Sequence, residues 1–306
     1  MVLPRWFPAA LLVLAASGCT KRPAAGAPVP RPAGPLDLEA ARTYVIDLVN
    51  RDRGELGLEP VERDEVAEKA AQRHVDDMAQ QGFTAHWGSD GSVPEQRYTE
   101  AGGEHFVMEN AMCFFDQQQR ELDPHPLFEA AELEKIELAF LSEKPPNDGH
   151  RKNIIKPVHN RLGIGLAKPV GVPQPCMAQE FVDAYGSYSG LPSKARLRQT
   201  LKIEGEVEDP VKFGGVGVGR IDPMKPISAA KLNTTSTYKV PEPYILYFPS
   251  GYKTPKPVSV SGRQFSIEVP LDDGGRPGRY QVSIWGKYPD KGEELVPISL
   301  RTLIVN

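Results

Sequence analysis

The stretch "FLSEKPPNDGHRKNII" (residues 140–155) places a glutamate, a histidine and an arginine around a turn of prolines, asparagine, aspartate and glycine. A neutral imidazole can bind a metal ion or move a proton, and a neighbouring carboxylate can orient its ring. The same residue types also occur in polar loops that connect two helices. The stretch therefore allows two interpretations: a chemical site around Glu143 and His150, or a solvated connection.

Several patterns of common enzymes are missing or incomplete in the chain. "GSYSG" carries Tyr188 where a nucleophile elbow needs serine, and "GGVGVGR" lacks the spacing and following helix of a dinucleotide loop, so it predicts a glycine-rich strand with a bulge. The sequence contains neither His-x-x-x-His nor Cys-x-x-Cys, which disfavours a dedicated zinc protease. His74 lies within a helical pattern and is expected to pack or face solvent. His105, His125 and His159 are expected to be solvated.

Seven segments of the first half occur in an order that is typical of one known family. The segments are "VNRDRGELGLEPV", "FTAHW", "DGSVPEQRYTEAG", "MENAM", "FLSEKPPNDGHRKNI", "RLGIGLA" and "QEFVDAYG". Together they resemble the CAP superfamily, also called the SCP or pathogenesis-related-1 (PR-1) family, over about residues 37–187. The resemblance implies an α+β fold, in which a small antiparallel sheet lies between helices as an α-β-α sandwich.

The resemblance also implies a cleft lined by two histidines and two acidic residues. Carried over position by position, these are His86, Glu109, Glu143 and His150. Two neutral imidazoles are good ligands for zinc or another divalent metal, and carboxylates can complete the shell or hold the second ring nitrogen. His86 and His150 are therefore the candidate metal ligands of an open, weak site, while no catalytic residue can be assigned. Glu143 is either the fourth member of this cluster or the last solvated residue of a helix.

Helical periodicity predicts the elements that must position these residues. Apolar residues recur at helical spacing in three runs, over about 37–57, 62–82 and 126–142. Ser92 is a candidate N-cap of a further helix, with Glu95 three residues later and Pro94 in the first turn, where proline is tolerated. Two strand-like runs, "RLGIGLA" and "AQEFVDAYG", follow the last helical run.

The pattern changes after about residue 190. Apolar and polar residues alternate in several runs, turn-rich segments such as "DDGGRPGR" separate them, and no helical period appears. We therefore predict a CAP domain over residues 37–190 and a separate antiparallel β domain over 195–306, with a sandwich as the favoured architecture.

The first nineteen residues, "MVLPRWFPAALLVLAASGC", run from one arginine through an apolar stretch to small residues and a cysteine. This pattern predicts a secretory signal peptide over residues 1–19, because the stretch is too short for a membrane span with ordinary flanks. Its end resembles a bacterial lipobox, which implies that Cys19 is lipidated and anchors the protein to a membrane. Thr20 after the cysteine indicates the outer membrane by the same resemblance. An ordinary exported protein that is cleaved nearby is the alternative.

Residues 20–36 contain five prolines and almost nothing that could form a core, so they predict a semi-extended tether. Two further cysteines, Cys113 and Cys176, follow in what would be an oxidising compartment, where a disulfide persists. Sequence alone does not show whether their α-carbons approach closely enough. A disulfide and two separately buried cysteines therefore both remain open.

Composition limits the classes of function. With 306 residues, 40% hydrophobic and 25% charged, the chain indicates a globular protein of about two domains. Its net charge of -4 and its dispersed lysines and arginines disfavour nucleic acid as a partner.

We expect an exported CAP-domain binding protein of the bacterial cell envelope, whose cleft takes a small ligand, a peptide or a glycan and can hold a divalent metal. One alternative is a metal-assisted hydrolase of a peptide or envelope polymer, with His86 and His150 holding the metal. The other is an adhesion or scaffold protein that acts through the β domain.

Overall fold

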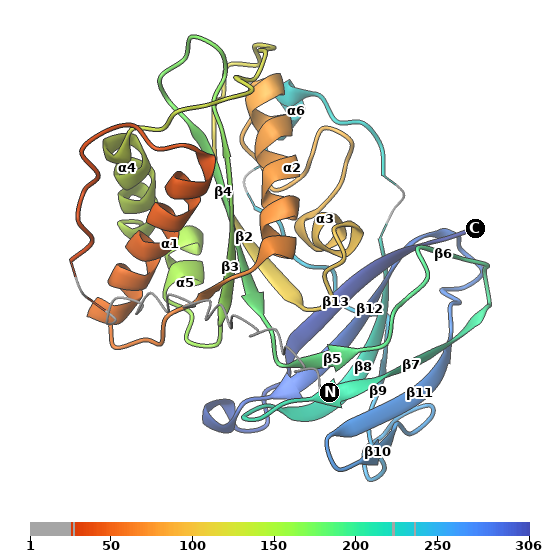
Figure 1. Ribbon diagram of the computed structural model, residues 1–306. Coiled ribbons are helices and arrows are strands. Elements are labelled where there is room, and N and C mark those ends of the chain that lie inside the picture. The colour runs from red at the N-terminus through yellow and green to blue at the C-terminus, as the bar shows by residue number, and fades with distance from the viewer. Residues whose placement is uncertain (1–25, 27, 222–223, 236) are drawn as a thin grey trace, which may run out of the picture.

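The computed structural model describes residues 26, 28–221, 224–235 and 237–306. Figure 1 shows that helices gather around a small sheet in the first half of the chain, and that strands dominate the second half. The predicted signal peptide and Cys19 lie outside the described residues. Among the helices that are described, none combines the length and the apolar character that crossing a bilayer requires.

A sheet with the strand order β1-β3-β4-β2 is the centre of the first half. Its strands are β1 (Glu62–Arg63), β2 (Phe106–Met112), β3 (Arg161–Ala167) and β4 (Cys176–Asp183). The pairings of β4 with β2 and β3 are antiparallel, whereas β1 adds to β3 in parallel.

Helices cover both faces of this sheet (Figure 1). On one face lie α1 (Leu38–Glu55), α4 (Ala130–Leu141) and α5 (Gly149–Ile154), and on the other lie α2 (Glu65–Gln81) and α3 (Pro94–Glu100). One apolar core joins α1 and α4 to the sheet, and further cores join α2 to the opposite face. The α-β-α sandwich that the resemblance implied is therefore confirmed.

The long helices begin and end at residues that satisfy their free backbone groups. Asp37 caps α1 by accepting a hydrogen bond from the backbone N–H of Ala40, and Asp64 caps α2 in the same way. Gly82 ends α2 in the left-handed conformation, with φ of 70°. The Asp64 cap explains why α2 starts at Glu65, whereas Glu62 and Arg63 before the cap form strand β1.

Helix α2 lies directly on β3 because two strand residues carry no side chain. A Cβ on Gly163 would lie 2.2 Å from the backbone nitrogen of Glu68, and one on Gly165 would lie 2.4 Å from the carbonyl carbon of Ala71. Because both obstacles are helix backbone, no side-chain rotation could relieve the overlap. The "GIG" of β3 therefore sets the distance between helix and sheet.

The second half forms a β-sandwich. One sheet has the order β10-β11-β7-β5 and the other the order β6-β13-β12-β8-β9. The strands are β5 (Gly186–Tyr188), β6 (Lys194–Ala195), β7 (Thr200–Val207), β8 (Lys212–Ile221), β9 (Ile245–Tyr247), β10 (Ser259–Ser261), β11 (Gln264–Pro270), β12 (Gly278–Lys287) and β13 (Val296–Val305). A short 3-10 helix, Pro289–Lys291, precedes β13, and the inward residues of both sheets form one apolar core. The predicted β-sandwich is confirmed, except that its strands are not all antiparallel, since β6 pairs with β13 in parallel.

Three details of the second half differ from expectation. The sandwich begins at Gly186, earlier than residue 195, because the short strand β5 has no alternating pattern that sequence reading could detect. A short helix, α6 (Ala229–Leu232), interrupts the strands, and Leu232 packs into the core beneath α2. The glycine-rich run became strand β8, and its pairing with β12 shifts register beside Trp285, as the predicted bulge requires.

Two details of the first half also differ. Helix α3 is capped by Val93 without a side-chain hydrogen bond, so the predicted cap by Ser92 is wrong. Glu95 does not form a capping box, since partners from the second half bind its carboxylate. The described end of the predicted tether contacts the helices, because Leu36 pairs with Phe128 through two backbone hydrogen bonds of 2.8 Å.

The two halves contact each other through polar groups around α3. Thr302 on β13 donates from its backbone to the hydroxyl of Thr99 at 3.2 Å. On β12, Gln281 donates to Glu95 at 2.7 Å, and Arg279 bonds to Gln96. Since these side chains are largely buried, this contact belongs to the fold rather than to a loose junction.

Candidate functional site

One cavity, with a volume of about 560 Å³, is lined by all four residues of the predicted cluster, His86, Glu109, Glu143 and His150. The other lining residues come from α3, β2, the loop before α5, α5 itself and the segment after α6. They are Pro94, Glu95, Val107, Met108, Pro146, Asn147, Asp148, Gly149, Lys152, Asn153, Thr237, Tyr238 and Val240. The structure therefore brings the four candidates together, including Glu143.

His86 lies in the loop between α2 and α3, where the buried ring of Phe83 anchors the chain. Its Nδ1 atom lies 2.9 Å from Oε1 of Glu109. Because a carboxylate only accepts hydrogen bonds, Nδ1 of the neutral ring carries the proton. Nε2 on the opposite edge of the ring is left with a free lone pair. About a quarter of the His86 side chain is exposed, 23%, so this lone pair is accessible.

Glu109 projects from β2 and is completely buried. Burial alone would raise the pKa of its carboxyl group. The Arg97 guanidinium, whose Nη2 lies 2.6 Å from Oε2 of Glu109, outweighs this effect and holds the pKa well below its usual value. Arg97 also donates to the carbonyl oxygen of His86 at 3.2 Å. One buried ion pair thus fixes both the ring partner and the backbone of His86.

A second buried carboxyl group lies beneath this pair. Glu180 on β4 is directly opposite Glu109 in the antiparallel pairing of β2 and β4. Burial and the negative charge of Glu109 raise the pKa of Glu180 well above its usual value. Two carboxylates this close cannot both ionise easily, so Glu180 is neutral while Glu109 keeps its charge beside Arg97.

His150 stands in the first turn of α5, directly after the turn of the 140–155 stretch. Its Nδ1 atom lies 2.6 Å from Oε1 of Glu143, and its backbone N–H donates to Oε2 of the same carboxylate at 2.9 Å. The ring packs on Phe140, with centroids 4.7 Å apart. Burial lowers the pKa of His150, although Glu143 opposes that effect, so the neutral ring again presents Nε2.

Buried amides hold the two histidine segments together. Asn110, which follows Glu109, donates to the carbonyl oxygen of His150 at 3.1 Å. Asn153, one turn after His150, donates to the carbonyl oxygen of Glu109 at 3.2 Å and to Asn110 at 2.9 Å. These bonds fix α5 to β2, which is the reason that the two histidines meet across the cavity.

The two imidazoles would supply a metal site with two protein ligands. Their ring centroids are 6.2 Å apart. Rings whose Nε2 atoms share a tetrahedral zinc ion at about 2.0–2.1 Å have centroids roughly 5 Å apart, so the two rings would have to approach by about 1 Å to share an ion. Across the described ranges, however, no three His, Cys, Asp or Glu side chains are arranged to hold a metal. The donor set therefore suits a two-histidine site completed by water or ligand, rather than a structural zinc site.

The remaining histidines do not line the cavity, although Nε2 of His74 lies 3.5 Å from Oε1 of Glu109. Burial lowers the pKa of His74 to about 4, and its Nε2 donates to the carbonyl oxygen of Ala85 at 2.7 Å, so it packs as expected. His125 is exposed, whereas His105 is half-buried. The prediction that His159 is solvated is wrong. Its ring is buried against Phe181 and its Nδ1 lies 2.5 Å from Asp183, because the chain before β3 turns inward.

Sequence reading missed Arg97, Glu180 and Tyr238. Arg97 lies within a recognisable segment, but an arginine in a short polar helix ordinarily predicts a solvated face. Glu180 lies in "QEFVDAYG", where nothing marks it as opposite Glu109. Tyr238 lies 143 positions after its partner Glu95, and no spacing could connect them.

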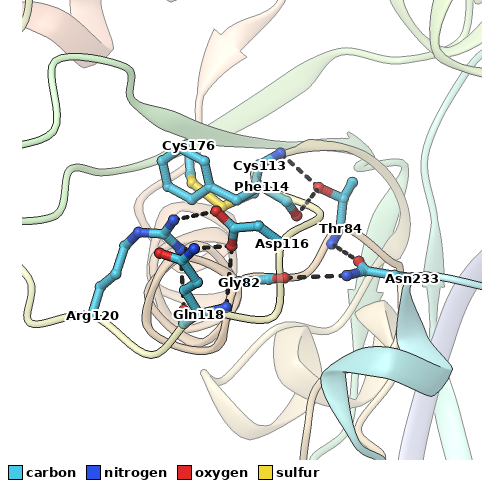
Figure 2. Close-up of a disulfide and its surroundings, with 9 residues drawn as sticks. All are labelled: Gly82, Thr84, Cys113, Phe114, Asp116, Gln118, Arg120, Cys176 and Asn233. Atoms are coloured by element: carbon cyan, nitrogen blue, oxygen red, sulfur yellow. Dashed lines mark hydrogen bonds and ion pairs between the residues drawn. A yellow bond between two sulfur atoms is a disulfide. The ribbon is translucent and has the colours of Figure 1, made fainter.

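Cys113 and Cys176 form a disulfide with α-carbons 4.4 Å apart. The bond joins the residue after β2 to the first residue of β4, close to the loop that carries His86. Figure 2 shows the backbone N–H of Cys113 donating to the Thr84 hydroxyl at 2.9 Å, and Asn233 accepting from the Thr84 N–H at 3.0 Å. The loop before His86 is thus held from two sides.

A comparison with known families matches part of the first half of the chain. A family model described as CAP, the cysteine-rich secretory protein family, matches residues 46–169. Residues 46–169 are therefore a CAP domain, within the stretch for which the seven segments predicted one. No curated protein matches the chain.

Three solved structures are similar to parts of the chain. An extracellular protein containing an SCP domain from Bacillus anthracis is 18% identical, with a TM-score of 0.37, over 50% of this chain and 45% of that protein. An outer surface protein from Borrelia burgdorferi is 15% identical, with a TM-score of 0.34, over 48% and 96%. A chitin binding domain from Burkholderia pseudomallei is 14% identical, with a TM-score of 0.24, over 38% and 57%. The chain thus spans less than half of the Bacillus protein.

Proposed function

We propose that this protein is an exported, envelope-anchored binding protein, and that the CAP cleft holds a small ligand, a peptide or a glycan by hydrogen bonds. One observation carries the proposal. Each histidine of the cleft has its Nδ1 occupied by a glutamate, His86 by Glu109 at 2.9 Å and His150 by Glu143 at 2.6 Å. Both rings are thereby fixed with Nε2 free as an acceptor or metal ligand. The cleft is therefore preorganised for binding.

The charges around the cleft favour a neutral or cationic ligand over an anionic one. The charged lining residues are Glu95, Glu109, Glu143, Asp148 and Lys152. Asp148 neutralises the charge of Lys152, at 2.7 Å, and Glu109 neutralises that of Arg97. Neither cation is therefore available to bind an anion. Hydroxyl and amine groups, which sugars and peptides both carry, suit two lone pairs and nearby carboxylates.

A divalent metal is compatible with this role. His86 and His150 would hold it through Nε2, and a bound ion would supply a Lewis-acid contact for a ligand oxygen. The glutamates then act as orienting partners of the rings, because each carboxylate already accepts from an Nδ1–H.

The hydrolase alternative needs a base that can take a proton from water. Glu109 is a poor base, because the Arg97 guanidinium holds its pKa well below the usual value in spite of burial. Both oxygens of Glu143 already accept hydrogen bonds from His150, so neither is free to receive a proton from water without losing a bond to the ring or the backbone. These contacts favour binding over hydrolysis.

Export is supported by residues outside the cleft. The signal-peptide pattern and Cys19 predict a lipid anchor, and we propose the outer membrane as its location because Thr20 follows the cysteine. The buried disulfide between Cys113 and Cys176 is consistent with folding in an oxidising compartment.

Calorimetric titration tests the proposal directly. The mature chain from residue 20 onward is titrated with zinc chloride and, separately, with a soluble digest of peptidoglycan, which contains both glycan and peptide. The protein is compared with a His86→Ala, His150→Ala double variant and with His125→Ala, which removes an exposed histidine elsewhere. We expect saturable heat in the wild type and in His125→Ala, and its loss in the double variant.

Heat that is unchanged in the double variant would place binding outside the cleft. In that case the adhesion alternative is favoured, and the groove of about 640 Å³ on the sandwich, lined by β5, β7, β11 and β10, is the next candidate.

A further inference from the structure

We propose that the cleft of the CAP domain is completed by the second half of the chain, and that Tyr238 restricts which ligands reach His86 and His150. This inference rests on the proposed function for its consequence, but its structural basis and its test are independent of any ligand. It deepens that function by assigning a role to the β-sandwich that the CAP fold alone does not provide.

The segment between β8 and β9 leaves the sandwich and lies along the CAP domain. We call residues 224–235 and 237–240 the crossing segment. Figure 1 shows its helix α6 beside α2, far from the strands that precede and follow it in the chain. The N–H of Ile227 donates to the carbonyl oxygen of Ser89 at 2.8 Å, and Leu232 is completely buried beneath α2. The segment is therefore packed on the domain and not merely near it.

Its contact with the loop of His86 is specific. The Asn233 side chain accepts from the N–H of Thr84 at 3.0 Å and donates to the carbonyl oxygen of Gly82 at 3.2 Å (Figure 2). These are the two backbone groups that end α2 and begin the loop carrying the first histidine. A residue of the second half thus accepts the hydrogen bond of the Thr84 N–H, and it adds a second donor to the Gly82 carbonyl oxygen, which also accepts from the N–H of Gln117 at 2.9 Å.

Beyond Asn233 the crossing segment reaches the cavity itself. Thr237, Tyr238 and Val240 all line it, together with the two histidines. The Tyr238 hydroxyl donates to Glu95, a buried carboxylate that also accepts from Gln281 of β12. Glu95 therefore joins α3, the crossing segment and the sandwich at one point, which explains why it is buried instead of capping its helix.

The ring of Tyr238 is held as firmly as its hydroxyl. It meets the indole of Trp87 edge to face, with centroids 5.0 Å apart and planes at 86°. Trp87 is the chain neighbour of His86, so a change in the position of Tyr238 would be felt beside the first histidine. Two contacts of different kinds, one polar and one aromatic, fix this wall of the cleft.

The chemistry of the wall narrows the ligand. The crossing segment contributes a hydroxyl, an aromatic ring and an aliphatic side chain to the lining, and no charge. The other side of the cavity presents imidazole nitrogens and carboxylates. A ligand that fills both sides has hydrogen-bonding groups on one face and apolar surface on the other, as a sugar ring or a short peptide does.

Chemical modification of the histidines tests whether the wall controls access. Diethyl pyrocarbonate modifies neutral imidazole nitrogens, and peptide mapping by mass spectrometry gives a rate for each histidine. Tyr238→Ala removes both the hydrogen bond and the ring contact. We expect the rate at His86 to rise by about tenfold relative to the exposed His125. Tyr252→Ala removes an exposed tyrosine of the same half, which does not line the cavity, and should leave the rate unchanged.

Equal rates at His86 in the wild type and Tyr238→Ala, with equal melting temperatures, would overturn the inference. If Tyr238→Ala is too unstable to assay, Tyr238→Phe removes only the hydroxyl bond to Glu95 and should raise the rate by about fivefold. An unchanged rate at His86 in Tyr238→Phe would also overturn the inference. A raised rate together with absent calorimetric binding would leave the wall in place and reject the proposed function, so the two failures are distinguishable.

Discussion

Arg97 and Glu109 form a buried ion pair, with Nη2 2.6 Å from Oε2 and both side chains almost wholly removed from solvent. Such a pair repays the cost of burying two charges only if both partners are present. In this protein the pair also determines the site, since Glu109 holds Nδ1 of His86 while Arg97 holds the backbone carbonyl of the same residue. The stability of the fold and the orientation of the first histidine are therefore linked.

Glu109→Gln should destabilise the fold strongly. The amide removes the charge that pairs with the buried guanidinium of Arg97, and removing one partner of such a pair costs about 3–5 kcal/mol. Urea denaturation followed by circular dichroism measures the change in the free energy of unfolding. A loss below about 1 kcal/mol, which is typical of an exposed pair, would contradict the buried pairing.

Glu143→Gln should behave differently, although the two glutamates hold equivalent ring atoms. The Glu143 side chain is 25% exposed and has no buried counter-charge, so we expect little change in stability. Because the amide holds Nδ1–H of His150 less well, zinc affinity should fall by about 10- to 100-fold. Calorimetry measures this, with Glu132→Gln on α4 as the matched control. An unchanged zinc affinity would show that Glu143 is only a solvated residue at the end of its helix.

Glu137→Gln should change how stability depends on pH. Burial raises the pKa of Glu137 from 4.5 to about 8, and only one of its oxygens is bonded, to Gln179 at 2.5 Å. The folded state holds this proton more tightly than the unfolded state does. The titration of Glu137 therefore leaves the stability of the wild type at its full value below pH 4.5, and stability falls as the pH rises to about 8 and the buried carboxyl group loses its proton. The variant should therefore be more stable than wild type at pH 8, by roughly 2–4 kcal/mol, and nearly equal at pH 4.5. Parallel stability curves would contradict the raised pKa.

Removal of the disulfide should lower stability without changing the fold class. Cys113→Ser with Cys176→Ser releases a closed loop with a sequence separation of 63, and we expect a loss of about 2–4 kcal/mol. Reducing agent should lower the melting temperature of the wild type and leave the double variant unaffected. If reductant shifts both proteins equally, its effect does not come from this bond.

Gly163→Ala should destabilise the CAP domain, because the added methyl group would meet the backbone of α2. Overpacking of this kind costs about 1–3 kcal/mol, and more where backbone must move. Gly190→Ala is the matched control, since nothing lies within 4 Å of the position of its Cβ. Equal melting temperatures for the two variants would show that the helix can move away at little cost.

The fold class and the four cleft residues were predictable because the CAP segments are local in sequence and keep their order. Helix ends at Asp37 and Asp64 follow equally from local capping chemistry. The predictions that failed concern residues whose partners are distant in the sequence. The sequence predicts a solvated Arg97, because its partner Glu109 lies on another element. It predicts a capping box at Glu95, because the partner Tyr238 lies far along the chain. Burial of a charge by a distant segment leaves no periodic pattern.

We propose that the free Nε2 atoms of His86 and His150 are the binding groups of the cleft. Nitrogen-15 NMR of the imidazole side chains, recorded while the peptidoglycan digest or zinc chloride is added, tests it most directly. We predict that both histidines carry their proton on Nδ1 in the free protein, and that both Nε2 signals shift on addition. Protonated Nε2 atoms, or Nε2 signals that stay fixed while the ligand binds, would contradict the account.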